Sequence, residues 1–309
     1  FTDGENHQLI DPLAVEDMQP LKDFLSTGKL WMHGADYDIV LMRRDLDVVP
    51  PMIYDTQIGA RLLGVKKFGY ANLVEHYCGE EISKSSQKAD WAKRPLTDIM
   101  RKYAINDVLY LKPIVDQILT GLHEKGRYEW FIESCENARE KVLARPMSKE
   151  DPWRISGCGK LQPKALAYLR ALWYWRDAEA MKWDRPTFMV CGNKQLITWA
   201  LDLSSGKDPV LPKHFRTTRR KCFVEAVEEV KGLSEDLYPK RPAAKGKRNK
   251  DEAFDKRVEE MLAKRDKVAA ELDIDSSLLI NRAILESIAA QEVESSDVLM
   301  KWQHELLNF

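Results

Sequence analysis

Apolar residues in several stretches of this chain recur three and four positions apart, which is the spacing of an amphipathic helix. The clearest pattern in the first half follows Arg101 and runs through Val108, Leu111, Ile114, Val115, Ile118, Leu119 and Leu122. It predicts one amphipathic helix that packs on a core through this stripe. Two short runs, 29–32 and 52–56, are predicted strands. Strands between helices indicate an α/β domain.

Shorter segments with the same helical pattern lie on both sides of this stripe. The predicted helices are 14–25, 38–46, 56–63 and 69–77 in the first half, and 166–181 and 193–201 in the second. Asp55 is the candidate N-cap of the helix at 56–63. At the N-terminus, Asp3-Gly4 predicts a hairpin turn before a strand at 7–11, so the chain is expected to begin inside a larger structure.

From residue 151 the composition changes to a connector rich in Gly, Pro and polar residues, and an internal repeat follows it. Shifting the chain by 89 positions aligns the segment from Arg176 with the segment from Arg265 without a gap; Asp184 then matches Asp273, and Leu196 matches Leu285. Both copies predict a helix, a polar corner, an apolar dipeptide and a second helix. The basic stretch 239–250 between them is a predicted flexible linker.

The overall charge and the cysteines exclude some classes of protein. The 309 residues carry a net charge of −1, although 213–221 and 239–250 are locally basic. Five cysteines without a C-x-x-C spacing suggest neither a disulfide framework nor a zinc knuckle, so a reducing cytoplasm fits best. No apolar run is long enough to span a membrane, and no signal peptide is recognisable.

The predicted chemistry lies near the start of the long helical stripe and at one strand end. Tyr103 and Asp107 are four residues apart, so a phenol and a carboxylate would share one helix face. Carboxylate oxygens suit Mg²⁺ or Mn²⁺, and a phenol can orient a water molecule. Asp38 follows a predicted strand, where α/β folds place polar catalytic groups. The simpler alternatives are an exposed acid beside a half-buried tyrosine, and for Asp38 an acid favoured by a helix dipole.

The polar loop between the helix at 69–77 and Pro95 combines cations with an aromatic ring. Lys84, Lys88, Lys93 and Arg94 surround Trp91, a mixture suited to phosphate and base contacts. A solvated loop without function is the alternative.

Four motifs in order, HGADYD, YDTQIGARLL, ADWAKRPL and YAINDVLYL, resemble the ribonuclease D family of DEDD 3′–5′ exonucleases, in the branch with tyrosine in its last motif. The resemblance implies an RNase H-like domain in which four carboxylates hold two divalent ions, Mg²⁺ or Mn²⁺. By this resemblance Asp38 is the third carboxylate and Asp107 the fourth, and Tyr103 positions the attacking water. His33, Lys84, Trp91 and Arg94 are then the expected substrate contacts.

One part of the family pattern is missing. The first two carboxylates belong to an Asp-x-Glu motif on a central strand, but before Asp38 only Asp3-Gly4-Glu5 has these letters, and it lies at the predicted turn. We therefore expect the first strands of the domain to be absent, and this fragment to be inactive although the full chain would be an enzyme.

The second half looks like two HRDC domains, small helical nucleic-acid-binding modules. The predicted organisation is an incomplete exonuclease domain at 1–145, an HRDC domain at 151–237 and a second HRDC-like domain at 251–309, with 151–309 folding independently. Expected phosphate contacts are Lys213, Arg216, Arg219, Arg220 and the segment 240–250.

The predicted function is a monomeric cytoplasmic exoribonuclease that trims structured RNA, such as tRNA precursors, to nucleoside 5′-monophosphates. A non-catalytic nucleic-acid-binding protein stays open as an alternative. A DNA exonuclease also stays open, because no motif indicates contacts to a 2′-hydroxyl.

Overall fold

The computed structural model describes residues 1–309 except 83–85, 88, 148–149 and 242–250. The chain forms two compact units. The first unit combines Phe1–Pro146 with Arg248–Phe309, and the second unit is Met147–Lys247.

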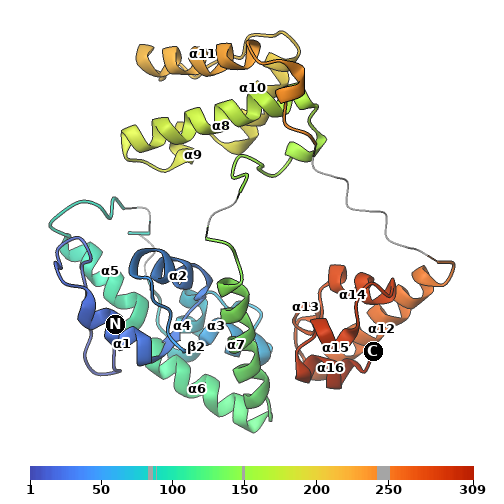
Figure 1. Ribbon diagram of the computed structural model, residues 1–309. Coiled ribbons are helices and arrows are strands. Elements are labelled where there is room, and N and C mark those ends of the chain that lie inside the picture. Colours follow the sequence, from blue (N-terminus) through green and yellow to red (C-terminus); the bar gives the residue numbers. More distant parts are fainter. Residues whose placement is uncertain (83–85, 88, 148–149, 242–250) are drawn as a thin grey trace. The chain divides into compact units, whose positions relative to one another are not determined.

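The N-terminal part of the first unit is built on two strands, β1 (Lys29–Met32) and β2 (Met52–Asp55), as predicted. They pair in parallel, with Lys29 opposite Met52 and Met32 opposite Asp55. Helix α7 packs against β2, and the ring of Phe131 on α7 stacks on Trp31 of β1 with centroids 5.6 Å apart. The helices around the strands are α1 (Gln19–Thr27), α2 (Asp36–Leu41), α3 (Thr56–Leu62), α4 (Tyr70–Cys78), α5 (Asp98–Leu109), α6 (Leu111–Glu124) and α7 (Tyr128–Leu143), and a π-helical turn, η1 (Met42–Leu46), extends α2 (Figure 1).

The N-terminal segment differs from its prediction. The Asp3-Gly4 turn forms, because the Asp3 carboxylate accepts hydrogen bonds from the backbone N–H groups of Glu5 and Asn6. The predicted strand at 7–11 is wrong: only a single antiparallel bridge joins Thr2 to His7. A strand needs a partner along its length, and two residues before the turn are too few.

The long predicted helix is also wrong, because the chain forms two helices that meet at Tyr110. Helix α5 ends at Leu109 and α6 begins at Leu111, with Tyr110 at φ −94° and ψ 3°. In a continuous helix the carbonyl of Leu109 would accept the N–H of residue 113. Since Pro113 has no N–H, the helix loses that hydrogen bond, and the apolar stripe continues in a new helix.

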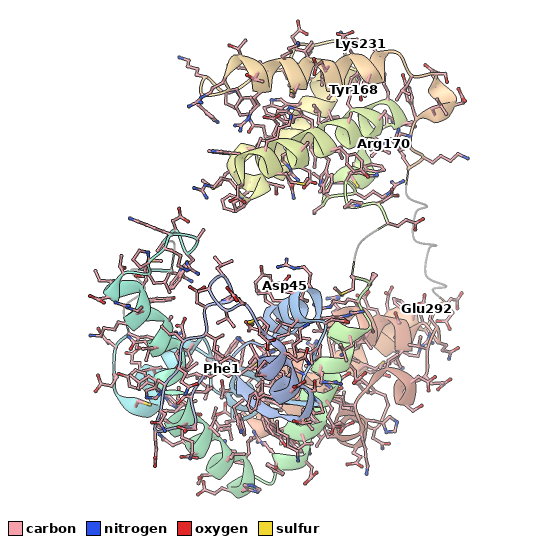
Figure 2. All side chains as sticks on the ribbon, turned by 60° about the vertical axis from the view of Figure 1, so that its left-hand side comes forward. Phe1, Asp45, Tyr168, Arg170, Lys231 and Glu292 are labelled. Carbon is pink, nitrogen blue, oxygen red and sulfur yellow. The ribbon has the colours of Figure 1, made fainter. Side chains whose placement is uncertain are left out.

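The second unit is helical and has its own core. Two of its helices, α8 and α11, pack side by side, as Tyr168 and Lys231 mark in Figure 2. The rings of Trp175, Trp199, Phe215 and Phe223 meet edge to face or tilted, with centroids 5.1 to 6.3 Å apart. The elements are η2 (Cys158–Lys160), α8 (Pro163–Trp183), α9 (Thr187–Val190), α10 (Asn193–Ser204), α11 (Thr217–Lys231) and η3 (Glu235–Leu237).

The predicted repeat is confirmed as a structural repeat. Helix α8 ends before Asp184 at φ 50°, and α12 ends before Asp273 at φ 51°. The short helices α9 and α13 and the starts of α10 and α14 follow at the same 89-residue offset. The corner hydrogen bonds match as well, since Arg185 N donates to Ala180 O and Ile274 N donates to Ala269 O, both at 3.0 Å. The C-terminal elements are α12 (Phe254–Leu272), α13 (Ser276–Leu279), α14 (Arg282–Ala289), α15 (Ser295–Val298) and α16 (Lys301–Leu307).

These C-terminal helices share a hydrophobic core with the N-terminal part of the first unit. Trp302 stacks on Trp130 with centroids 5.1 Å apart, and the Glu133 carboxylate accepts the backbone N–H groups of Lys301 and Trp302 at the start of α16. Arg127 donates to the carbonyls of Leu62 and Leu272. This shared core does not support the expectation that 151–309 folds without upstream residues, because the last part of that segment buries apolar side chains against α7.

Candidate active site

Asp38 stands in the first turn of α2, and a buried carboxylate fixes the turn that leads to it. The Oδ1 atom of Asp55 accepts the N–H of Gly34 at 2.9 Å and of Gln57 at 2.8 Å, while Oδ2 accepts the N–H of Ala35 at 2.9 Å. Asp55 thus caps α3, as predicted, and also holds the segment between β1 and α2. Asp38 itself keeps part of its surface exposed at this fixed start.

His33 and Tyr70 connect this segment to α5. The Nδ1 atom of His33 lies 2.9 Å from Thr56 Oγ1, and its ring centroid lies 5.4 Å from that of Tyr70. Tyr70 Oη donates to the carbonyl of Asn106 at 3.1 Å, directly before Asp107. Burial lowers the pKa of His33, so its imidazole is neutral at pH 7. The contacts therefore join the HGADYD segment to the helix that carries Tyr103 and Asp107.

Tyr103 and Asp107 lie on α5 as the spacing predicts, with Tyr103 half-buried and Asp107 exposed. Burial raises the pKa of the Tyr103 phenol, and the nearby Asp107 charge raises it further. The pKa of Tyr70 is also raised, mainly by burial and in part by Asp107. Asp107 therefore interacts electrostatically with both phenols, which keeps them protonated and able to donate hydrogen bonds.

Both candidate metal ligands are acids whose ionised form is disfavoured. Burial raises the pKa of Asp38, where the charge of Asp55 contributes in the same direction, and burial also raises the pKa of Asp107. A bound cation would offset this cost. Within the part of the chain that the structure describes, no group of three or more His, Cys, Asp or Glu side chains could hold a metal ion. Each of the two acids is therefore suited to bind a divalent ion only as part of a larger set of ligands.

Among the predicted substrate contacts, Trp91 lies next to Tyr103, and Arg94 is already paired with an acid of the chain. The ring centroids of Trp91 and Tyr103 are 5.9 Å apart, and Trp91 Nε1 donates to the carbonyl of Ser86. Arg94 makes a two-pronged ion pair with Asp11, both contacts at 2.6 Å. Lys84 and Lys88 lie outside the described residues.

The four predicted cations of the second unit fall into two pairs. Lys213 and Arg216 are exposed. Arg219 donates to Glu179 at 3.1 Å, and Arg220 donates to the carbonyls of Phe215 and Pro212. Arg220 therefore holds the loop before α11, and Arg219 joins α11 to α8. Most of the segment 240–250 lies outside the described residues.

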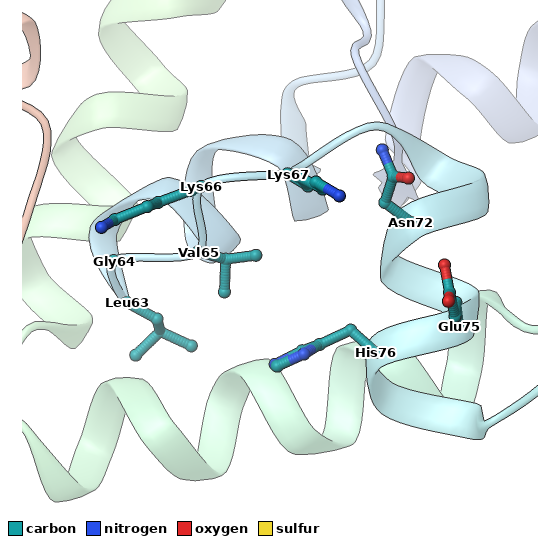
Figure 3. Close-up of a pocket in the computed structure, with 8 residues that line it drawn as sticks. All are labelled: Leu63, Gly64, Val65, Lys66, Lys67, Asn72, Glu75 and His76. Carbon is teal, nitrogen blue, oxygen red and sulfur yellow. The ribbon is translucent and has the colours of Figure 1, made fainter.

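A separate hollow of about 650 Å³ lies between the end of α3 and α4 (Figure 3). None of the predicted site residues lines it. Its lining is Leu63, Gly64, Val65, Lys66, Lys67, Asn72, Glu75 and His76.

Sequence reasoning missed Tyr70 and the double role of Asp55. Tyr70 is the first residue of α4, and nothing in its local sequence indicates that its hydroxyl reaches α5. The signal at Asp55 was present, because it lies inside YDTQIGARLL, but a cap to α3 explained it locally. Only the parallel pairing of β1 and β2 brings its carboxylate to Gly34 and Ala35.

Comparison with known proteins identifies this type of fold. A family model described as a 3′–5′ exonuclease matches residues 1–123. Ribonuclease D of Xanthomonas oryzae pv. oryzae is 30% identical over 293 residues, covering 93% of this chain and 80% of that protein. Ribonuclease D of Shewanella sp. is 33% identical, with 64% of this chain and 52% of that protein covered. The chain thus spans from about half to four fifths of the curated relatives.

Solved structures agree with this. Escherichia coli RNase D, described as an exoribonuclease involved in structured RNA processing, matches with a TM-score of 0.70 and 25% identity, covering 99% of this chain and 84% of that one. A Bifidobacterium adolescentis protein shares the fold with a TM-score of 0.76 at 22% identity, over 94% of this chain and 79% of that one. The class is therefore that of the 3′–5′ exonuclease fold. The chain belongs to the ribonuclease D family. No described helix is long and apolar enough to cross a bilayer.

Proposed function

We propose that this chain carries the exonuclease fold of a 3′–5′ exoribonuclease. The observation that carries the proposal is the contact path from His33 through Tyr70 to the carbonyl of Asn106, which links the Asp38 segment to the helix of Tyr103 and Asp107. Asp38 lies in the same segment as His33, and Asp107 follows Asn106. Both acids have raised pKa values, and both suit the role of ligand to a divalent cation, Mg²⁺ or Mn²⁺.

In this proposal each side chain has a distinct role. Asp38 and Asp107 would hold divalent ions together with further carboxylates, and such ions would supply stabilisation of the charge that develops at a phosphodiester. The protonated Tyr103 hydroxyl orients the attacking water, and Trp91 offers its ring beside it to the terminal base. Cleavage at each 3′ end releases a nucleoside 5′-monophosphate.

Two carboxylates do not complete a two-ion site, so we propose that an Asp-x-Glu pair on a further strand supplies the rest. Neither β1 nor β2 contains such a pair. The Asp3-Gly4-Glu5 sequence forms the turn, where Asp3 already accepts hydrogen bonds from its neighbours. We therefore propose that the 309-residue chain alone does not release nucleotides from RNA.

The substrate of the complete site is proposed to be the 3′ end of structured RNA such as a tRNA precursor. The support is the family membership and the repeated helical motif, which we propose to be two HRDC-like modules that bind nucleic acid, with Lys213 and Arg216 as phosphate contacts. We also propose that the protein is a monomer in the cytoplasm. The incomplete carboxylate set favours a non-catalytic nucleic-acid-binding protein as second candidate, and a DNA exonuclease is third.

The test compares the 309-residue chain with a longer protein that includes the Asp-x-Glu strand, on end-labelled RNA with Mg²⁺ or Mn²⁺. The longer protein should trim RNA and its Asp107→Asn variant should not, because the amide cannot replace a charged metal ligand. Asp116→Asn, an exposed acid paired with Lys112 on α6, is the matched control.

Two results would contradict the proposal. Metal-dependent trimming by the 309-residue chain overturns the carboxylate argument. RNA binding without trimming by the longer protein favours the non-catalytic alternative.

A further inference from the structure

Four large apolar side chains are exposed together at the corner between α8 and α9. They are Met181 with 71% of its surface exposed, Trp183 with 45%, Phe188 with 72% and Met189 with 44%. We call residues 181–189 the aromatic corner. Within the described second unit, the core buries Trp175, Trp199, Phe215 and Phe223 but leaves Phe188 largely exposed and Trp183 partly exposed. Contiguous exposed apolar surface on a soluble protein is typical of binding sites, whereas singly exposed apolar residues are common.

The second copy of the repeat shows what this corner does when it has a partner. Its equivalent residues contact the N-terminal part of the first unit: Arg127 donates to the carbonyl of Leu272 at 2.7 Å. Gly64 approaches so closely that a Cβ there would lie 2.3 Å from the carbonyl oxygen of Asp273. The same backbone geometry therefore forms a partly covered corner in one copy, where Leu272 is half-buried while Glu271 and Ser277 stay exposed, and a corner with exposed aromatic side chains in the other.

The residues at equivalent positions differ in size and in charge. Where the covered corner has Leu272 and Ser277, the aromatic corner has Trp183 and Phe188. Where the covered corner has Glu271 and Ile274, the aromatic corner has Lys182 and Arg185. The covered corner is small, apolar and acidic, whereas the exposed one is aromatic and basic.

More cations lie at the same end of the second unit. Figure 1 shows that α9 and the beginning of α11 are at one end of the α8 and α11 pair. Arg219 of α11 lies over the ring of Trp183, with Cζ 5.0 Å from the centroid, which fixes this side of the corner. Lys213 and Arg216, directly before α11, are exposed and form no ion pair among the described residues.

We infer that the aromatic corner is a stacking platform for unpaired RNA bases, with Lys213 and Arg216 contacting the adjacent phosphates. Aromatic faces beside cations are the combination that binds single strands, because every base has a face to stack and every nucleotide a charge. A protein partner of the kind that covers the second copy would not need this excess of cations. The inference rests on the proposed function only for the choice of RNA as the nucleic acid.

The test measures binding by the 309-residue chain in EDTA, so that hydrolysis plays no part. The probe is a labelled oligouridine of about 12 nucleotides, a length that suits one module. Phe188→Ser and Trp183→Leu, separately and combined, place in the aromatic corner the residues that the other copy carries at the same backbone positions. Phe24→Ser is the matched control, because Phe24 is an exposed phenylalanine of the first unit with 51% of its surface accessible.

We expect the double variant to lose affinity by roughly tenfold or more, and Phe24→Ser to leave it unchanged. The salt dependence should stay the same in the aromatic variants, whereas Arg216→Ala should reduce its slope by about one. A fully paired RNA of the same length should bind the double variant and the unaltered protein equally, because its bases are not free to stack.

Three outcomes overturn the inference. The first is unchanged single-strand affinity in a double variant whose circular dichroism is native. The second is an equal loss on paired RNA. The third is an unaltered protein that forms dimers which the double variant does not form, which would make the corner an interface between copies. Because no step uses catalysis, loss of exonuclease activity elsewhere leaves this test unaffected.

Discussion

The role assigned to Tyr103 can be tested by removing its hydroxyl group alone. In the protein with a complete carboxylate set, Tyr103→Phe keeps the ring beside Trp91 but removes the hydroxyl that orients water. We expect turnover to fall by roughly 10²- to 10⁴-fold with little change in RNA affinity. Single-turnover kinetics and binding in EDTA separate the two effects. Tyr174→Phe, an exposed tyrosine of the second unit, serves as control. An unchanged turnover number would make Tyr103 a packing residue.

Asp107 should lower the stability of the metal-free protein at neutral pH, and the pH dependence of the melting temperature tests this. Because burial raises its pKa in the folded state, the folded protein holds this proton more tightly than the unfolded chain does. The resulting stability is present below the ordinary carboxyl pKa of about 4 and is lost as pH rises through the folded-state pKa. Without metal at pH 7.5, Asp107→Asn should therefore have a higher melting temperature than the unaltered protein, and the difference should shrink towards pH 4. A difference that grows on acidification would show the opposite shift.

At the scale of elements, Asp55 holds together two helix starts that carry the site. Its buried carboxylate accepts three backbone N–H groups, and Asp55→Ala would leave all three without this acceptor. Since each unpaired buried group costs about 1–3 kcal/mol, we expect the first unit to lose at least about 2–4 kcal/mol of unfolding free energy. Amide exchange should accelerate first at Gly34, Ala35 and Gln57.

Asp45→Ala is the control for this measurement, because Asp45 is an exposed acid whose ion pair with Arg44 lies on the surface. It should change neither unfolding nor exchange measurably. If Asp55→Ala also changed neither unfolding nor exchange, the hydrogen bonds from Asp55 to the Asp38 segment would not contribute to stability.

For the whole molecule, the division of the core predicts which pieces fold alone. Met147–Lys247 has a core of its own, so it should unfold cooperatively as an isolated fragment. Residues 248–309 should not, because Trp302 and the carbonyl of Leu272 find their partners on α7 and its N-terminal flank. Thermal unfolding followed by circular dichroism tests both fragments. Cooperative unfolding of 248–309 alone would show that its contacts with α7 are dispensable.

The sequence alone determined the features that depend on neighbours along the chain. Both strands, the helices α2, α3 and α4 and the cap by Asp55 follow from local periodicity and capping, whereas α7 was not predicted. The repeat was visible in the same way, because the left-handed residues Asp184 and Asp273 end their helices through local hydrogen bonds. The break at Tyr110 was also encoded locally by Pro113, but the unbroken apolar stripe concealed it.

Only the tertiary structure decided which distant groups meet. Tyr70 reaches Asn106, Asp55 reaches Gly34, and Arg219 is held by Glu179, across separations from 21 to 40 residues. Periodicity shows that a face is buried but not against what, since the hydrophobic effect has no direction. For the same reason two copies of one motif could not be told apart in advance: one corner is contacted by Arg127 and Gly64 of the first unit, while the equivalent corner leaves Phe188 exposed.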